Sequence, residues 1–181
     1  MPIIGWSFLK DAEDYMIGNR RGIRNDKPII GTYGANRQGS GDMYPKGGNM
    51  LHTIRYVIND DNKWLSNLRG LNAEFWHQTV STEQIESYIA SQAGIDLRKI
   101  FDQYLRTTKI PLLKYKVDGK TLSFNYEEVI KGFAMPIRVA INSKEVTITP
   151  NEARQTLVFP EEIKTFEVNR NFYIDVAKND L

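Results

Sequence analysis

The spacing of apolar residues divides the sequence into a helical part and a part rich in strands. Between residues 44 and 110, apolar side chains recur three or four positions apart, as they do along one face of an α-helix. After Pro111 the apolar positions alternate with polar ones, which is typical of strands with one buried face. The sequence therefore predicts an α+β fold, in which a loop-rich helical segment precedes a small antiparallel β-sandwich.

Four helices are predicted in the helical part, and three of them have clear capping residues. Asp60 and Asp61 can cap the second helix, and Ser81-Thr82-Glu83-Gln84 forms a capping box for the third, which Gly94 ends. Asp96 can cap the fourth helix. The four apolar stripes are Met50, Leu51, Ile54, Val57 and Ile58; Trp64, Leu65, Leu68, Leu71, Phe75 and Trp76; Ile85 and Ile89; and Leu97, Ile100, Phe101, Tyr104 and Leu105.

The strand-rich part is expected to begin near Pro111, so that residues 1–112 and 113–181 form two domains. Asp118-Gly119 is the strongest hairpin signal in the sequence, and Asn142-Ser143 is a weaker one. Seven short strands are predicted at Leu113–Val117, Thr121–Tyr126, Pro136–Asn142, Glu145–Thr149, Gln155–Phe159, Thr165–Val168 and Phe172–Val176.

Glycine is concentrated at the N-terminal end, where nine of the 13 glycines fall within residues 1–48. A short helix is predicted from Leu9 to Ile17, ending at Gly18. Residues 28–42 show no sustained period and are expected to form a long exposed loop. The glycines in this loop miss the spacings of phosphate-binding motifs, and Lys46 is followed by two glycines instead of Gly and Ser or Thr. A nucleotide site is therefore not expected.

Charge and composition exclude several classes of function. The 24 basic and 22 acidic residues give a net charge of +2, and both signs are spread evenly, so no basic stripe for nucleic acid is present. No segment approaches the length of a membrane span. The absence of cysteine excludes disulfides, zinc-thiolate sites and a cysteine nucleophile, but it does not assign a compartment.

The two histidines, His52 and His77, do not have the spacing of a metal site. His52 falls within an apolar helix and is expected to be partly buried and hydrogen-bonded. His77 is expected at the end of the second helix, where the helix dipole favours it. Adjacent carboxylates such as Glu127 and Glu128 point in different directions, so capping and solvated faces explain them.

One segment carries a more specific signal. Residues 42–55, Asp-Met-Tyr-Pro-Lys-Gly-Gly-Asn-Met-Leu-His-Thr-Ile-Arg, resemble the aminopeptidase N family of zinc metallopeptidases, in which a Tyr-x-Lys-Gly motif opens a helix that continues to an Arg. The resemblance covers about 70 residues, from Asp42 to Leu113. Four further elements follow in the order found in that family: Val80–Glu83, Ala93–Leu97, Phe101–Leu105 and Lys109–Leu112.

The resemblance implies a role for Tyr44. In the family, the tyrosine of the motif points its phenol at the scissile carbonyl. A phenol with a pKa of about 10 stays protonated at neutral pH and can donate a hydrogen bond to the oxyanion that forms when zinc-bound water attacks. The structural alternative is that Tyr44 packs at the helix start between the loop and the helices. Lys46 and Gly47 are expected to be structural, with Gly47 allowing close approach of a helix.

The zinc-binding half of the family's site is missing from this sequence. The family binds zinc through His-Glu-x-x-His and a glutamate on the next helix, and no His-Glu pair occurs here. The resemblance thus implies the C-terminal portion of such a peptidase: the end of a thermolysin-like catalytic domain, then a β-sandwich. The expected partners are a peptide substrate and the missing N-terminal portion of the same protein, which would hold the zinc.

Two functions remain open from the sequence. The first is a piece of a zinc aminopeptidase, in which Tyr44 stabilises the transition state and the helices form the walls of the cleft; the chain alone is then expected to bind no zinc and to be inactive. The second is a non-catalytic helix-plus-sandwich module that binds peptide, glycan or protein through the 28–42 loop and exposed sheet edges.

Overall fold

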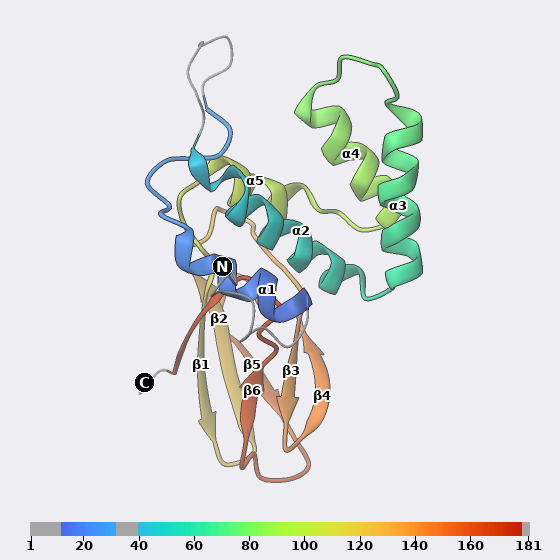
Figure 1. Ribbon diagram of the computed structural model, residues 1–181. Coiled ribbons are helices and arrows are strands. Elements are labelled where there is room, and N and C mark those ends of the chain that lie inside the picture. The colour runs from blue at the N-terminus through green and yellow to red at the C-terminus, as the bar shows by residue number, and fades with distance from the viewer. Residues whose placement is uncertain (1–11, 32–39, 179–181) are drawn as a thin grey trace, which may run out of the picture.

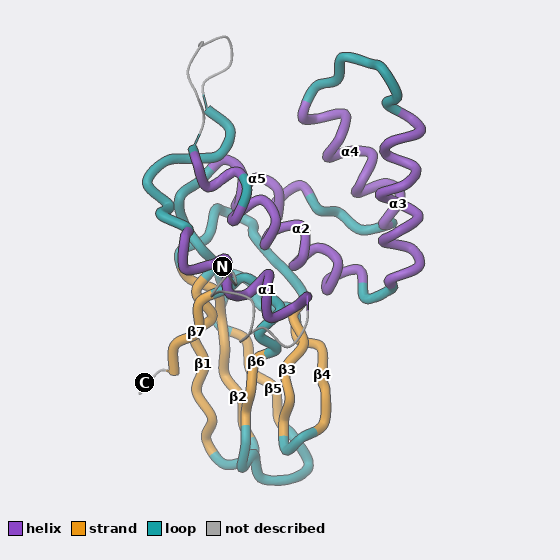
Figure 2. Tube along the Cα trace, viewed as in Figure 1, coloured by secondary structure: helices purple, strands orange, loops and turns teal. Residues whose placement is uncertain are grey.

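The computed structural model describes residues 12–31 and 40–178. The helices lie at one end of this part of the molecule and the strands at the other (Figure 1). The trace in Figure 2 shows α3 and α4 side by side, to one side of α2 and away from the strands. The fold class is α+β, as predicted.

The described residues of the helical part form five α-helices and two short 3-10 helices. Four of the α-helices are those predicted between residues 44 and 110, and the fifth is the predicted short N-terminal helix, of which residues 9–11 lie outside the described residues. The elements are α1 (Ala12–Gly18), η1 (Asn19–Gly22), η2 (Gly41–Met43), α2 (Pro45–Ile58), α3 (Asp61–Glu74), α4 (Thr82–Ala93) and α5 (Arg98–Arg106).

Local capping explains where most of these helices begin and end. Asp60 accepts the backbone N–H of Lys63 at the start of α3. The capping box of α4 is complete, because Ser81 and Gln84 each accept a backbone N–H from the other, and Gly94 ends the helix with a left-handed φ of 68°. Both predictions for α4 are confirmed.

Two helix predictions are wrong in detail. Asp96 is not the N-cap of α5; Leu97 takes that position, and Asp96 binds the Arg98 backbone and side chain from one residue earlier. Trp76 lies beyond the end of α3 and is 71% exposed. The helix stops at Glu74 and the chain turns through the left-handed His77, so Trp76 cannot continue the apolar stripe.

The predicted 28–42 loop is only partly described, since residues 32–39 lie outside the described residues. At its end Ser40 and Asp42 are buried, and residues 41–43 form η2. The prediction of an exposed loop is therefore wrong at these two positions, because their polar groups bond to nearby backbone instead of water.

The strand-rich part contains two small sheets. One has the strand order β5-β2-β1-β7 and the other β4-β3-β6. Each of the seven predicted strands is present within a few residues of its expected position. The strands are β1 (Leu112–Asp118), β2 (Thr121–Glu127), β3 (Ile137–Ile141), β4 (Lys144–Ile148), β5 (Gln155–Val158), β6 (Phe166–Val168) and β7 (Asp175–Lys178).

Both predicted hairpins form. Gly119, with a φ of 57°, follows β1 and allows the chain to reverse into β2. Asn142 and Ser143 both have positive φ, at 49° and 64°, as a two-residue hairpin between β3 and β4 requires. Asparagine adopts this conformation more readily than most residues, which explains how a turn without glycine works here.

The last strand differs most from the prediction. β7 begins at Asp175, three residues later than predicted, and it pairs with β1 in parallel. The sheet is therefore mixed and not fully antiparallel. Phe172 and Tyr173, predicted as strand residues, are buried just before β7. The structural reason is that Tyr173 stacks on Tyr104 of α5, with ring centroids 5.8 Å apart, and its carbonyl accepts the Tyr104 phenol.

The buried apolar side chains of the helices and of both sheets form one continuous cluster. Phe101 and Tyr104 of α5 lie in it together with Leu113 of β1 and Ile137 of β3. The division into domains at residue 112 stays a prediction. None of the helices in the described residues combines the length and the apolar character needed for a membrane span.

Candidate functional site

Tyr44 lies at the beginning of α2, directly after η2. Pro45 follows at the first helical position, where a missing N–H and a fixed φ favour the helix. The Tyr44 carbonyl accepts the Gly48 N–H at 2.9 Å, so its backbone belongs to the first turn of α2. Its side chain is 80% exposed. The packed Tyr44 of the structural alternative is therefore not observed.

A stripe of buried polar residues runs from η2 along α2 behind Tyr44. Its members, Asp42, Lys46, Asn49 and Thr53, are each at most 3% exposed. Their spacing of four, three and four positions places them on one face of a helix. Buried polar groups are costly unless they are hydrogen-bonded, so the partners of this polar stripe fix where α2 lies.

Asp42 connects the backbone of residues 24 and 25 with the end of the 28–42 loop. Its carboxylate accepts the N–H of Arg24, at 3.1 and 3.2 Å to its two oxygens, and the N–H of Asn25 at 2.7 Å. Its own N–H donates to Ser40 Oγ at 3.2 Å. Asp42 therefore joins the 24–25 turn to η2, two residues before Tyr44.

Lys46 anchors the first turn of α2 from the other side. Its Nζ donates to the carbonyl oxygen of Thr107, after α5, at 2.8 Å. Burial lowers the pKa of Lys46 below its usual value of 10.5, and the Asp42 carboxylate partly opposes this shift. The structural role predicted for Lys46 agrees with these contacts.

Gly47 does not have its predicted role. A Cβ at Gly47 would meet no described atom within 4 Å, whereas one at Gly48 would lie 3.1 Å from Met16 Cε. The close approach of a neighbouring helix, α1, therefore occurs at the second of the two adjacent glycines.

Asn49 and Thr53 connect α2 to the beginning and end of the described chain. Asn49 accepts from Arg20 Nε at 2.7 Å and donates to the Met16 carbonyl at 3.1 Å. Thr53 Oγ1 accepts the Tyr173 N–H at 2.9 Å. The polar stripe thus bonds to four other segments of the chain, at residues 16–20, 24–25, 107 and 173. Tyr44 projects into solvent from the N-terminal end of α2, which these bonds fix in place.

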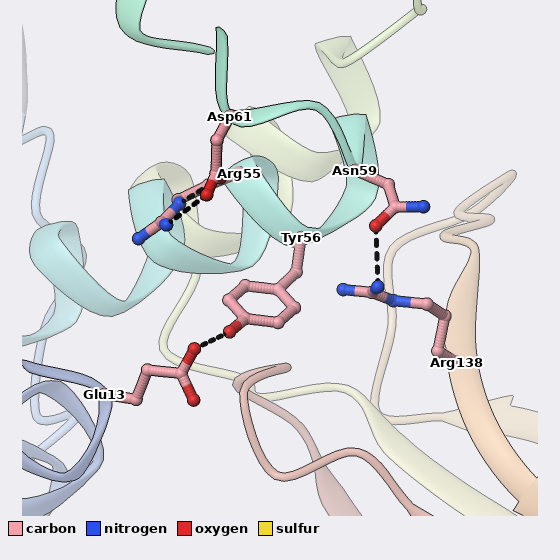
Figure 3. Close-up of a pocket in the computed structure, with 6 residues that line it drawn as sticks. All are labelled: Glu13, Arg55, Tyr56, Asn59, Asp61 and Arg138. Atoms are coloured by element: carbon pink, nitrogen blue, oxygen red, sulfur yellow. Dashed lines mark hydrogen bonds and ion pairs between the residues drawn. The ribbon is translucent and has the colours of Figure 1, made fainter. Parts of the chain in front are cut away.

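A second polar cluster lies at the other end of α2, around a pocket of about 350 Å³ (Figure 3). Tyr56 donates its phenol to Glu13 of α1, and its ring lies under the Arg138 guanidinium of β3, 4.9 Å away. Arg138 donates to Asn59 Oδ1 at 2.6 Å. The remaining lining residues, Arg55 and Asp61, pair with each other at 2.7 Å. Because these groups bond mainly to one another, the pocket is a junction between α1, α2, the start of α3 and β3.

Tyr56 should make stability sensitive to alkaline pH. Burial, together with the hydrogen bond to Glu13, raises the pKa of Tyr56 to about 12. The unfolded chain loses this proton near pH 10, so the native state binds more protons between pH 10 and about 12, and stability falls as pH rises through that window.

We expect this part of the alkaline loss to disappear in the Tyr56→Phe variant. Urea unfolding of both proteins should give a difference in free energy of unfolding that is constant below about pH 10. Above that pH the difference should shrink. A difference that stays constant up to pH 12 would contradict the assignment.

The described residues do not fit a zinc site. His52 is buried, and its Nε2 lies 2.9 Å from Asn171 Oδ1, as expected for a hydrogen-bonded core histidine. His77 lies three residues beyond the end of α3, with its ring against Trp76. Within residues 12–31 and 40–178, no group of three or more His, Cys, Asp or Glu side chains could hold a metal ion.

Comparison with known proteins points to aminopeptidases. No family model matches the chain. The sequence is 24% identical over 137 residues to a leucyl aminopeptidase of Saccharolobus solfataricus, covering 71% of this chain and 17% of that protein. The fold is similar to that of Legionella pneumophila aminopeptidase A, solved in complex with aspartic acid, with a TM-score of 0.63 and 14% identity over 87% of this chain and 21% of that one.

These comparisons concern a small part of each relative, since this chain spans roughly a fifth of the length of the proteins it matches. At 14% identity, the structural similarity shows a shared fold. The sequence similarity adds a relation to an aminopeptidase that covers most of this chain.

The sequence motif singles out Tyr44, whose catalytic role stays a prediction, but it does not indicate the polar stripe behind it. The sequence alone assigns no role to Asp42, Asn49 or Thr53. A signal was present: their spacing continues through Lys46 with the period of a helix face, next to the apolar face of Met50 and Ile54. Only the fold shows that their partners come from distant segments.

Proposed function

We propose that this chain belongs to a zinc-dependent aminopeptidase of the aminopeptidase N family, which hydrolyses peptide bonds at peptide N-termini. In this proposal residues 1–112 form the end of a thermolysin-like catalytic domain, and the sheets of residues 113–181 form a β-sandwich beside it. The zinc ligands and the general base belong to another part of the same protein, so this chain alone is inactive.

The observation that carries the proposal is that Tyr44 is exposed at the start of α2, where buried hydrogen bonds of Asp42 and Lys46 fix the backbone. The segment around it is the one that resembles the family, and the relation to a leucyl aminopeptidase supports the same activity. A phenol that projects from a fixed backbone can donate a hydrogen bond to a defined point in space.

The chemistry proposed for Tyr44 is stabilisation of negative charge. As a nucleophile adds to the scissile carbonyl, its oxygen becomes an oxyanion, and a neutral phenol O–H can donate to it. The proton stays on Tyr44 throughout, and the donor is strongest when the charge is largest, so the interaction favours the transition state over the bound peptide. The polar stripe fixes the backbone at the start of α2. The Tyr44 phenol can therefore donate to the oxyanion without a rearrangement of the helix.

The proposal is tested by expressing the full reading frame that contains this chain and, separately, residues 1–181. We expect the longer protein to bind about one zinc ion and to hydrolyse aminoacyl-4-nitroanilides, with activity lost on chelation and restored by zinc. The 181-residue chain should show neither property. Activity from residues 1–181 alone, or none from the full reading frame, would contradict the proposal.

A further inference from the structure

We propose that Asp42 is a positioning residue for Tyr44, and this inference rests on the proposed function. Asp42 is 3% exposed and therefore cannot touch a bound peptide. It acts through the backbone: its carboxylate holds the 24–25 turn, while its main chain forms η2, the turn that leads into Tyr44.

The hydrogen bonds favour a carboxylate at this position. Both oxygens of Asp42 accept backbone N–H groups, from Arg24 and Asn25, and no donor on the Asp42 side chain is needed. Hydrogen bonds to a charged acceptor are stronger than neutral ones. We call the contacts of the Asp42 carboxylate with Arg24 and Asn25 the clamp. An asparagine would keep one acceptor and would place an NH₂ group against the Arg24 N–H, so the nearly isosteric Asp42→Asn change weakens the Arg24 side of the clamp.

The clamp also fixes the conformation of the 24–25 turn. Asn25 has a φ of 51°, in the left-handed region, which asparagine adopts more readily than most residues. Its N–H makes the shortest of the Asp42 contacts, at 2.7 Å. The Asp42 carboxylate therefore stabilises this turn and η2 at once.

The other side of Tyr44 is fixed independently by the bond from Lys46 Nζ to Thr107 and by the first-turn bond from Gly48 to Tyr44. The Tyr44 backbone thus lies between two buried anchors, Asp42 two residues before it and Lys46 two residues after it. Loosening one anchor allows the phenol to leave its position while the helix remains. Small errors of position at a reacting centre lower the rate more than they lower substrate affinity.

The first test compares Asp42→Asn with Asp26→Asn in the full-length protein. Asp26 is exposed and lies beside the clamped turn, so its variant makes the same chemical change outside the clamp. We expect kcat to fall roughly tenfold in Asp42→Asn, with KM and zinc content nearly unchanged, and to stay constant in Asp26→Asn.

A double-mutant cycle with Tyr44→Phe separates positioning from general damage. If Asp42 acts through the Tyr44 phenol, Asp42→Asn should lower kcat by less than about twofold once that phenol is absent. A similar drop in both backgrounds would assign Asp42 a merely structural role. Should Asp42→Asn fail to fold, Ser40→Ala serves as the second variant, because it removes only the Ser40 Oγ that accepts the Asp42 N–H. It should lower kcat by a smaller factor than Asp42→Asn, and this loss should likewise shrink when Tyr44 is replaced by phenylalanine.

Hydrogen–deuterium exchange on the same proteins tests the anchor without reference to activity. Peptides that contain Arg24 and Asn25 should exchange at least about tenfold faster in Asp42→Asn, and at the wild-type rate in Asp26→Asn. Unchanged exchange would overturn the inference even if the enzyme is active. A wild-type protein without peptidase activity would instead overturn the proposed function, whatever the exchange shows.

Discussion

Replacing Tyr44 with phenylalanine in the full-length protein is expected to lower kcat by about 10²–10³-fold, the usual effect of removing one oxyanion donor. The change removes a single oxygen from a side chain that is 80% exposed, so stability should change by no more than about 0.5 kcal/mol. KM should change little, because the hydrogen bond forms mainly in the transition state. Steady-state hydrolysis of an aminoacyl-4-nitroanilide measures both constants.

Zinc content and a second phenol serve as controls for this prediction. Zinc bound per protein should be the same in wild type and Tyr44→Phe, since Tyr44 is not proposed as a ligand. Tyr115→Phe removes a phenol from β1, among the strands, and should leave kcat unchanged. An unaffected kcat in Tyr44→Phe would remove the proposed role, and a loss of zinc would show that the residue acts through the metal site.

The Phe133→Ala change is expected to lower the free energy of unfolding by about 3–5 kcal/mol. Phe133 is completely buried between β2 and β3, and its ring meets the edge of Tyr126 with centroids 5.5 Å apart. Truncation removes this contact and leaves a cavity that the packed surroundings fill only in part. Urea unfolding followed by far-UV circular dichroism measures the difference.

The same experiment tests whether the helices and sheets unfold together. Because one apolar cluster includes Phe101 of α5 and Phe133, circular dichroism and tryptophan fluorescence should report one midpoint, shifted equally in the variant. Val158→Ala is the matched control, since Val158 is 74% exposed on β5 and its truncation should change stability by less than about 0.5 kcal/mol. Two separate transitions, or a loss below about 1 kcal/mol in Phe133→Ala, would contradict the expectation.

Features that depend on neighbouring residues were predictable from the sequence. The capping box at Ser81 and the αL end at Gly94 are made by groups within a few positions of each other, and they form as predicted. The Asn142-Ser143 turn is similarly local. The alternation of apolar and polar residues predicted the positions of the seven strands, because one face of most of them lies against the core.

Features that depend on distant partners were not predictable in the same way. The apolar residues Phe172 and Tyr173 fit a strand pattern, but the fold places them against α2 and α5, and β7 begins only after them. The parallel pairing of β7 with β1 has no local signal at all. Asp42 belongs to the same category, since its partners lie 17 and 18 positions away across a glycine-rich segment.

The contact between Thr53 and Tyr173 has a consequence for the order of events during synthesis. The two residues are 120 positions apart, so α2 leaves the ribosome long before its last anchor exists. Helix formation needs only local contacts, but the final contact of the polar stripe must wait until the chain reaches residue 173. The surface that presents Tyr44 is therefore completed only after residue 173 has been translated, and a nascent chain interrupted before Tyr173 carries the helix without this contact.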